Sequence, residues 1–214
     1  LLMEYQLGDK HQVSLTLNKL LEVMYQEESG PDLEYALPAI TVPLLSGMED
    51  FQQYANAAQT AAKTVLSAES VTPSLSLLAS AGLALSAFEK GDSDEASAQY
   101  EPLLKYRGTM LYGGLGAVDR MLALICMVSG RFDDAAIHFQ QSYEFCTDSG
   151  YGPELAQTCH DYGSLMMIRG AQGDREKSAS MVEQGLWLTE ELGMENLKNS
   201  FQAQRALTSS HTSV

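Results

Sequence analysis

Residues 130–146, GRFDDAAIHFQQSYEFC, carry the pattern that decides the fold class. Apolar side chains recur along them at steps of three and four, at Phe132, Ala135, Ala136, Phe139, Tyr143 and Cys146. This spacing predicts an amphipathic α-helix. The two acidic residues after Phe132 fall where a first helical turn has free N–H groups and a positive dipole end. The preceding segment, 115–128, is apolar nearly all round, which predicts a helix covered on every side.

The glycine that opens this stretch belongs to a series with nearly constant spacing. A glycine followed by acidic residues and a helical pattern occurs at Gly8, Gly47, Gly91, Gly130 and Gly173. The intervals are 39, 44, 39 and 43 residues. Glycine commonly closes a helix because it adopts the left-handed conformation without a steric penalty. A unit of about 40 residues therefore predicts a repeating pair of helices.

A second set of turn signals divides each unit. These signals, rich in Gly, Pro and Ser, lie at 29–31, 70–73, 108–114 and 149–153. We therefore expect ten or eleven helices, in repeats that span approximately 1–29, 30–70, 71–107, 108–149 and 150–196, followed by a C-terminal helix and tail. Pro38 and Pro43 predict a kinked or broken helix between Pro31 and Ser46.

The repeats also share a small-and-aromatic code. Ala96 and Tyr100 follow Gly91 at the offsets at which Ala135 and Phe139 follow Gly130. This code is similar to that of the tetratricopeptide repeat. We expect an all-α chain, with residues 1–214 forming a single TPR-like superhelix of about five helix pairs. The first residues, 1–5, are typical of a helix cut within its length, so we expect a fragment of a longer protein.

Charge and composition argue against several classes of partner. The chain has 28 acidic and 13 basic residues, for a net charge of −15, and no basic stripe. Direct binding to nucleic acid or to an anionic membrane surface is therefore not expected. No apolar run approaches the roughly 18 residues of a membrane helix. Cys126, Cys146 and Cys159 lie in apolar helical contexts, which favours a reducing compartment and predicts a cytoplasmic protein.

The sequence offers little that is typical of catalysis. The glycine-rich stretch 113–116 has no following lysine, so it does not match a phosphate-binding loop. Residues 159–161, Cys-His-Asp, are adjacent on a predicted helix and point about 100° apart, so they cannot all grip one ion. We interpret His11, His138 and His211 as isolated surface or boundary residues. We predict no catalytic, metal-binding or cofactor-binding residues and no cofactor.

One candidate patch remains. Arg120 lies in an apolar helix, where an arginine usually has a carboxylate partner, so an ion pair between helices is the favoured interpretation and ligand binding the alternative. The long loop 106–114 is also suited to recognition. The hypothesis is a single partner-binding patch made by Arg107, Tyr112, Arg120, His160 and Tyr162.

Residues 107–196 carry a more specific signature than the repeat code. Its segments, in order, are 107–111 (RGTML), 113–115 (GGL), 118–120 (VDR), 130–135 (GRFDDA), 150–162 (GYGPELAQTCHDY), 173–177 (GDREK) and 190–194 (EELGM). This order resembles the C-terminal tetratricopeptide-like arm of large bacterial signalling ATPases. Many of these carry an adenylate or guanylate cyclase domain, and others carry a LuxR-type DNA-binding domain.

The resemblance implies a regulatory role. Such an arm is expected to bind a protein, a peptide or a ligand, or to pack on the parent's own ATPase module, without catalysis of its own. Two alternatives stay open, a free-standing TPR adaptor and, less favoured, an all-α enzyme. The sequence predicts neither the partner nor the oligomeric state.

Overall fold

The computed structural model describes residues 1–46 and 51–210. Within these ranges the chain is helical, with one isolated β-bridge between Met110 and Ala117 and no strand. The α-helices are α1 (Leu2–Gln6), α2 (Lys10–Gln26), α3 (Leu33–Thr41), α4 (Phe51–Ser67), α5 (Pro73–Lys90), α6 (Ser93–Ala98), α7 (Tyr100–Leu104), α8 (Val118–Val128), α9 (Phe132–Ser149), α10 (Gly152–Arg169), α11 (Asp174–Leu192) and α12 (Glu195–Ser210). Two short 3-10 helices are η1 (Pro43–Leu45) and η2 (Tyr112–Gly114). The all-α prediction is confirmed for this part of the chain.

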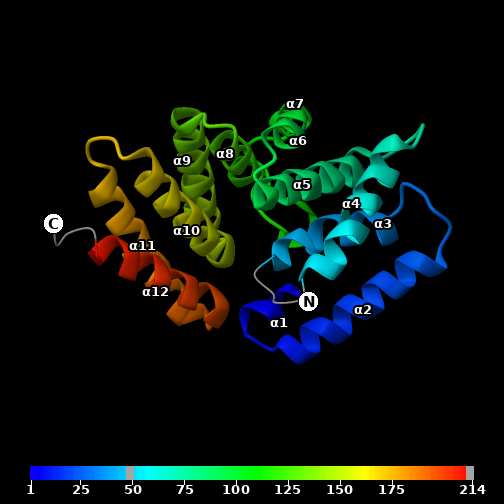
Figure 1. Cartoon of the computed structure of the whole chain (residues 1–214), viewed down its shortest axis with the longest axis horizontal. Helices are drawn as coiled ribbons and strands as arrows, with labels where there is room; N and C mark the ends of the chain where they lie inside the picture. Colours follow the sequence, from blue (N-terminus) through cyan, green and yellow to red (C-terminus); the bar gives the residue numbers. More distant parts are fainter. Residues whose placement is uncertain (47–50, 211–214) are drawn as a thin grey trace.

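The helices form two groups joined by α5 and α8. From α8 to α12, each helix packs against the one before it, and α10 also contacts α12 (Figure 1). On the other side, α3, α4 and α5 contact one another, and α2 packs on α3. Helix α5 also packs on α8 and so connects the groups.

The predicted turn glycines adopt the expected conformation. Gly91 ends α5 with φ 67°, in the left-handed region, and Gly8, Gly130 and Gly173 also have positive φ. Acidic side chains cap the helices that follow Gly8 and Gly91: Asp9 accepts a hydrogen bond from the Gln12 amide, and Asp92 accepts one from the Glu95 amide. The helices that follow Gly130 and Gly173, α9 and α11, have no side-chain cap. Gly47 lies outside the described residues.

Only one of the two prolines between residues 31 and 46 coincides with a helix break. Pro38 lies inside α3, which continues to Thr41, whereas Pro43 begins η1 after the break. The predicted interruption between 31 and 46 is therefore confirmed, and it lies at the second proline. In the next unit, the expected second helix is divided at Gln99 into α6 and α7.

The core runs through α8, whose residues from Val118 to Cys126 are all buried. This confirms the prediction of a helix covered on every side. Glycine allows the closest helix crossings: a Cβ on Gly82 of α5 would lie 2.0 Å from the carbonyl oxygen of Ala39 in α3. A Cβ on Gly185 of α11 would meet the ring of Phe201 in α12 at the same distance.

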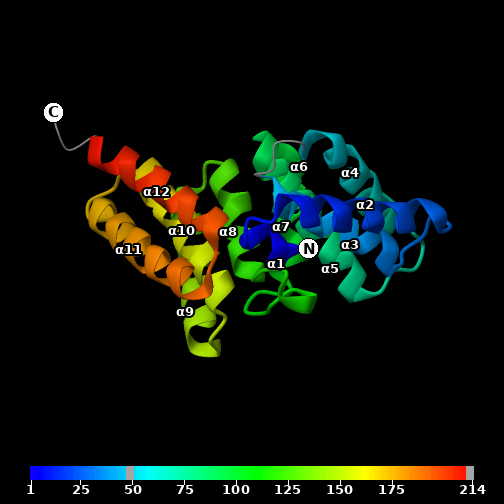
Figure 2. The same cartoon turned by 90° about the horizontal axis from the view of Figure 1, so that it is seen from below.

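The first helix of the chain packs on the last. The Asn196 side chain, at the start of α12, donates a hydrogen bond to the backbone carbonyl of Tyr5 in α1. Figures 1 and 2 both show α1 between the group α2–α5 and the group α9–α12. In the described ranges, no helix has the length and apolarity required to cross a lipid bilayer.

Candidate functional site

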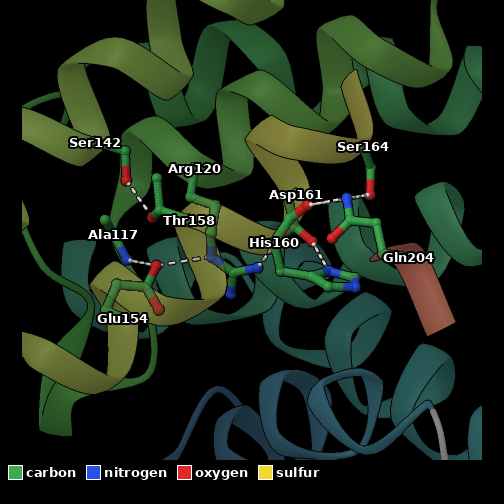
Figure 3. Close-up of polar contacts among 9 residues, drawn as sticks. All are labelled: Ala117, Arg120, Ser142, Glu154, Thr158, His160, Asp161, Ser164 and Gln204. Carbon is green, nitrogen blue, oxygen red and sulfur yellow. Dashed lines mark hydrogen bonds and ion pairs between the residues drawn. The ribbon is translucent and has the colours of Figure 1, made fainter. Parts of the chain in front are cut away.

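The site is built around a buried arginine on α8. The Arg120 side chain is only 5% exposed and contacts two carboxylates of α10. Its Nε donates to Glu154 Oε1 at 2.7 Å, and its Nη1 donates to Asp161 Oδ2 at 2.8 Å. Figure 3 shows the two carboxylates on opposite sides of the guanidinium. The predicted ion pair between helices is confirmed, and it has two partners.

Helix geometry explains why α10 supplies both carboxylates. Glu154 and Asp161 are seven residues apart, which is close to two helical turns, so both side chains lie on the same face. Glu154 Oε1 also accepts a hydrogen bond of 2.7 Å from the Ala117 amide just before α8. This second bond fixes the start of α8 against the first turn of α10.

The charges of the cluster stabilise one another. Burial by itself would lower the pKa of Arg120, but Glu154 and Asp161 raise it above its ordinary value. Burial would likewise raise the pKa of Asp161, whereas the hydrogen bond from His160 and the charge of Arg120 hold it below the ordinary 3.8. The salt bridge between Arg120 and Asp161 is therefore charged at neutral pH.

His160 extends the cluster toward α12. Its Nδ1 lies 3.0 Å from Asp161 Oδ1, and its ring meets Phe201 edge-on at a centroid distance of 5.2 Å. Gln204 Nε2 donates to the His160 carbonyl at 3.2 Å and to Ser164 Oγ at 3.0 Å. The cluster therefore spans α8, α10 and α12 (Figure 3).

This cluster borders a cavity of about 510 Å³ between the two helix groups. Arg120, Glu154, His160 and Asp161 supply polar groups to its wall, together with Glu89 at the end of α5. Much of the remaining wall is apolar and includes Leu44, Leu85, Phe88, Leu115, Leu124 and Leu197. Residues of α1 and α12 also line it, and these two helices pack on each other.

Glu89 differs from the other carboxylates of the cavity. The residue as a whole is solvent-exposed. Partial desolvation of its carboxyl group raises the pKa above the ordinary 4.5, a hydrogen bond with Ser46 opposes that shift, and the negative charge of Asp161 adds to it. Within the described residues, no lysine, arginine or histidine forms an ion pair with it. Glu89 is thus an acidic group at the cavity without a cation of its own.

The five residues of the hypothesised patch lie in different environments. Arg120 and His160 both line the cavity, where Asp161 contacts each of them. Arg107 and Tyr112 are exposed and do not line it. Tyr162 is buried, stacks on Phe139 at 5.6 Å and lies under the Lys177 ammonium group.

Sequence reasoning missed Glu89, Glu154 and Asp161 as cavity residues. The spacing of Glu154 and Asp161 indicates a shared helix face, and Arg120 needs a carboxylate partner. Glu154 and Asp161 could therefore have been predicted as partners of Arg120 from the sequence. Glu89 comes from α5, far away in the sequence. No local pattern places it beside α10.

The interpretation of His138 was wrong. His138 is 7% exposed, and its Nε2 lies 2.9 Å from the hydroxyl of Tyr100. Its Nδ1 lies 3.5 Å from Asp119 Oδ1, while Asp119 Oδ2 accepts a hydrogen bond of 2.5 Å from the Gly108 amide. The histidine therefore joins α7, α8 and α9.

His11 is exposed, as expected, and His211 lies outside the described residues.

The three cysteines are buried free thiols, as their apolar context predicted. Burial raises the pKa of Cys126 to about 11 and those of Cys146 and Cys159 to about 12. At neutral pH they are protonated and weakly nucleophilic. Among residues 1–46 and 51–210, no group of three or more His, Cys, Asp or Glu side chains is arranged to hold a metal ion.

Comparison with protein-family models, with curated proteins and with solved structures finds no match for this chain.

Proposed function

We propose that this chain is a non-catalytic recognition module of the TPR-like helical-repeat kind, and that it acts as the sensor arm of a signalling ATPase linked to a cyclase or to a transcription regulator. Its cavity is the recognition site. The partner is a ligand, a peptide or protein, or the ATPase module of the parent protein.

The observation that carries the proposal is the composition of the cavity wall. The wall combines residues of α1, α5, α8, α10 and α12, which come from both ends and the middle of the described chain. A ligand that contacts all of these helices stabilises one relative arrangement of the two helix groups over the others. Such differential contact is what a sensor needs in order to transmit binding to an attached domain.

The packing of helix on helix supports the repeat assignment. Helices that are consecutive in the chain are in contact, as for α3 and α4, for α8 and α9, and for α10 and α11. Elongated stacks of such pairs commonly bind partners on an inner surface.

The reading frame upstream of Leu1 provides the first test. It is expected to encode a phosphate-binding loop with glycines followed by Lys and Ser or Thr. A frame without such a loop would instead favour the free-standing adaptor.

The second test measures ATP hydrolysis by the full-length protein. Gln157 lines the cavity, so Gln157→Trp fills it with an indole, whereas Gln53→Trp changes an exposed position on α4. The first substitution is expected to change the hydrolysis rate by about five-fold or more and the second to leave it unchanged. Equal rates in both variants would contradict a sensor role for the cavity.

An enzyme is the second candidate, favoured by one contact. The His160 imidazole is held by the Asp161 carboxylate at the cavity wall, an arrangement that general bases share. Turnover of a chromogenic ester that is lost in His160→Gln would favour this function. The same background rate in both proteins would argue against it.

A further inference from the structure

We propose that the cavity binds a small organic cation, namely an ammonium group carried on an apolar body of about the size of a phenylalkyl chain. This inference rests on the proposed function and names the class of ligand that the arm would recognise. It follows from four properties of the cavity wall: its charge, an unpaired carboxylate, its apolar surface and an unsatisfied acceptor.

The wall has an excess of negative charge. Glu89, Glu154 and Asp161 are acidic, whereas Arg120 is the one lysine or arginine among the described residues that line the cavity. Counting only the Lys, Arg, Asp and Glu side chains of the wall, the formal balance is two negative charges. Fields inside a partly closed, low-dielectric site attract the opposite charge more strongly than the same groups do in water.

Arg120 is poorly suited to attract an anion. Its Nε and Nη1 are both engaged by carboxylates, at 2.7 Å and 2.8 Å. An anionic ligand that approached the guanidinium would come close to Glu154 and Asp161, which lie on opposite sides of it. Like-charge contact of this kind rejects a ligand, so the same cluster that holds α8 on α10 discriminates against carboxylates and phosphates.

Glu89 is the group that would pair with the cation. It lies at the end of α5 and lines the cavity together with the α10 cluster. The residue is solvent-exposed, its carboxyl group forms a hydrogen bond with Ser46, and it has no ion-pair partner among the described residues. Asp161 and partial desolvation both disfavour its charged form. A bound ammonium group would relieve both effects because it supplies the missing opposite charge.

The rest of the wall selects for an apolar body. Leu44, Leu85, Phe88, Leu115 and Leu197 line the space beside the acidic groups. The cavity volume of about 510 Å³ falls within the usual range of about 300–1,000 Å³ for small-molecule sites. A simple metal cation or a polyamine would leave this apolar surface without a partner.

An unsatisfied acceptor points to a donor-bearing ligand. Gln6 of α1 lines the cavity, and its side-chain oxygen is buried without a hydrogen-bond partner. Buried polar atoms of this kind are uncommon, and a ligand commonly satisfies them. An ammonium group has three N–H donors and no acceptor, which fits an environment of carboxylates and an amide oxygen.

Isothermal titration with three matched probes tests the proposal on the full 214-residue chain. The probes are phenylbutylamine, phenylbutanol and phenylbutanoate, which share an apolar body and differ in the charge of one end. Phenylbutylamine is expected to bind about ten-fold or more tightly than either of the others. Equal affinity for all three, a preference for phenylbutanoate, or binding of none would overturn the proposal.

Two variants locate the site, each with a matched control. Glu89→Gln removes the unpaired charge and is expected to weaken phenylbutylamine binding roughly three- to ten-fold, whereas Glu101→Gln, at an exposed position outside the cavity wall, leaves it unchanged. Gln157→Trp is expected to abolish binding and Gln53→Trp to preserve it. Binding that neither Glu89→Gln nor Gln157→Trp affects would place the amine elsewhere and overturn the proposal.

These outcomes are distinct from those of the ATPase test. If phenylbutanoate binds best in the cavity and Gln157→Trp still changes ATP hydrolysis, the cation inference fails and the sensor function stands. If phenylbutylamine binds as expected while ATP hydrolysis is insensitive to Gln157→Trp, the cavity is a cation site and the sensor function fails.

Discussion

Arg120 is the residue on which the cluster of α8 and α10 depends. It neutralises Glu154 and Asp161, and both contacts lie in a region from which most water is excluded. A buried ion pair contributes little net stability compared with a well-packed apolar group, but removal of one partner leaves an uncompensated charge. The consequences of substitution are therefore asymmetric.

We expect Arg120→Met to destabilise the fold by roughly 3–5 kcal/mol because it leaves two carboxylates without a cation. Urea unfolding followed by circular dichroism measures the change. Arg107→Met, at an exposed position, is the control and should change stability by less than about 0.5 kcal/mol. The triple variant Arg120→Met, Glu154→Gln, Asp161→Asn should recover part of the loss. A destabilisation below about 1 kcal/mol for Arg120→Met would contradict this account.

Asp161 should make stability depend on pH in the acid range. Its pKa is lower in the folded protein than the ordinary 3.8, so its contribution is fully present above that value and is lost as the pH falls through the folded pKa. The difference in unfolding free energy between wild type and Asp161→Asn should narrow as the pH falls below about 4. Urea titrations across this range measure it. A difference in unfolding free energy that widens as the pH falls would contradict this prediction.

At the scale of elements, close helix crossings depend on glycines inside helices. Gly82 lies within α5 where that helix crosses α3, and any Cβ would overlap the backbone carbonyl of Ala39. A backbone group cannot move aside as the end of a flexible side chain can. The α3–α5 contact in turn holds the wall of the cavity, because Leu85 lies one turn further along α5.

Gly82→Ala is therefore expected to destabilise the protein by roughly 1–3 kcal/mol or more through overpacking. The direction of the change in stability is informative. Alanine is the better helix former, so at a helical position with open space around it the same substitution would stabilise the protein by about 1 kcal/mol. Chemical denaturation provides the measurement. Ser74→Ala, at an exposed position of the same helix, serves as the control for propensity. A gain in stability for Gly82→Ala would show that α3 and α5 do not cross this closely.

At the scale of the whole molecule, the cavity exists because segments from both ends of the chain meet. Helix α1 packs on α12 and both line the cavity together with α5, α8 and α10. The contact includes the hydrogen bond from Asn196 to the Tyr5 carbonyl. Since α1 has only five residues and no fully buried side chain, it should be the least stable part of the cavity wall.

Asn196→Ala should accelerate amide hydrogen exchange in α1 about five-fold, because one hydrogen bond of about 1 kcal/mol is lost. Exchange in α8, α9 and α10 should be unchanged. Hydrogen exchange read by mass spectrometry resolves these segments, and Asn56→Ala, at an exposed position of α4, is the matched control. Uniform acceleration across the chain, or none in α1, would contradict a local role for this contact.

The sequence by itself determined the local structure of this protein. The steps of three and four from Phe132 to Cys146, the glycines at Gly91 and Gly130 and the proline at Pro43 act within one or two helical turns, so their consequences can be read along the chain. The need of Arg120 for a carboxylate also follows from local context. Tertiary structure decided which groups meet: Glu89 lines the same cavity as the α10 cluster, His138 is buried against Tyr100, and Tyr162 is buried whereas Arg107 and Tyr112 are exposed. Helix periodicity fixes the face on which a side chain lies, whereas the packing of distant helices fixes what lies opposite that face, and this is why the cavity and its charge emerged only from the structure.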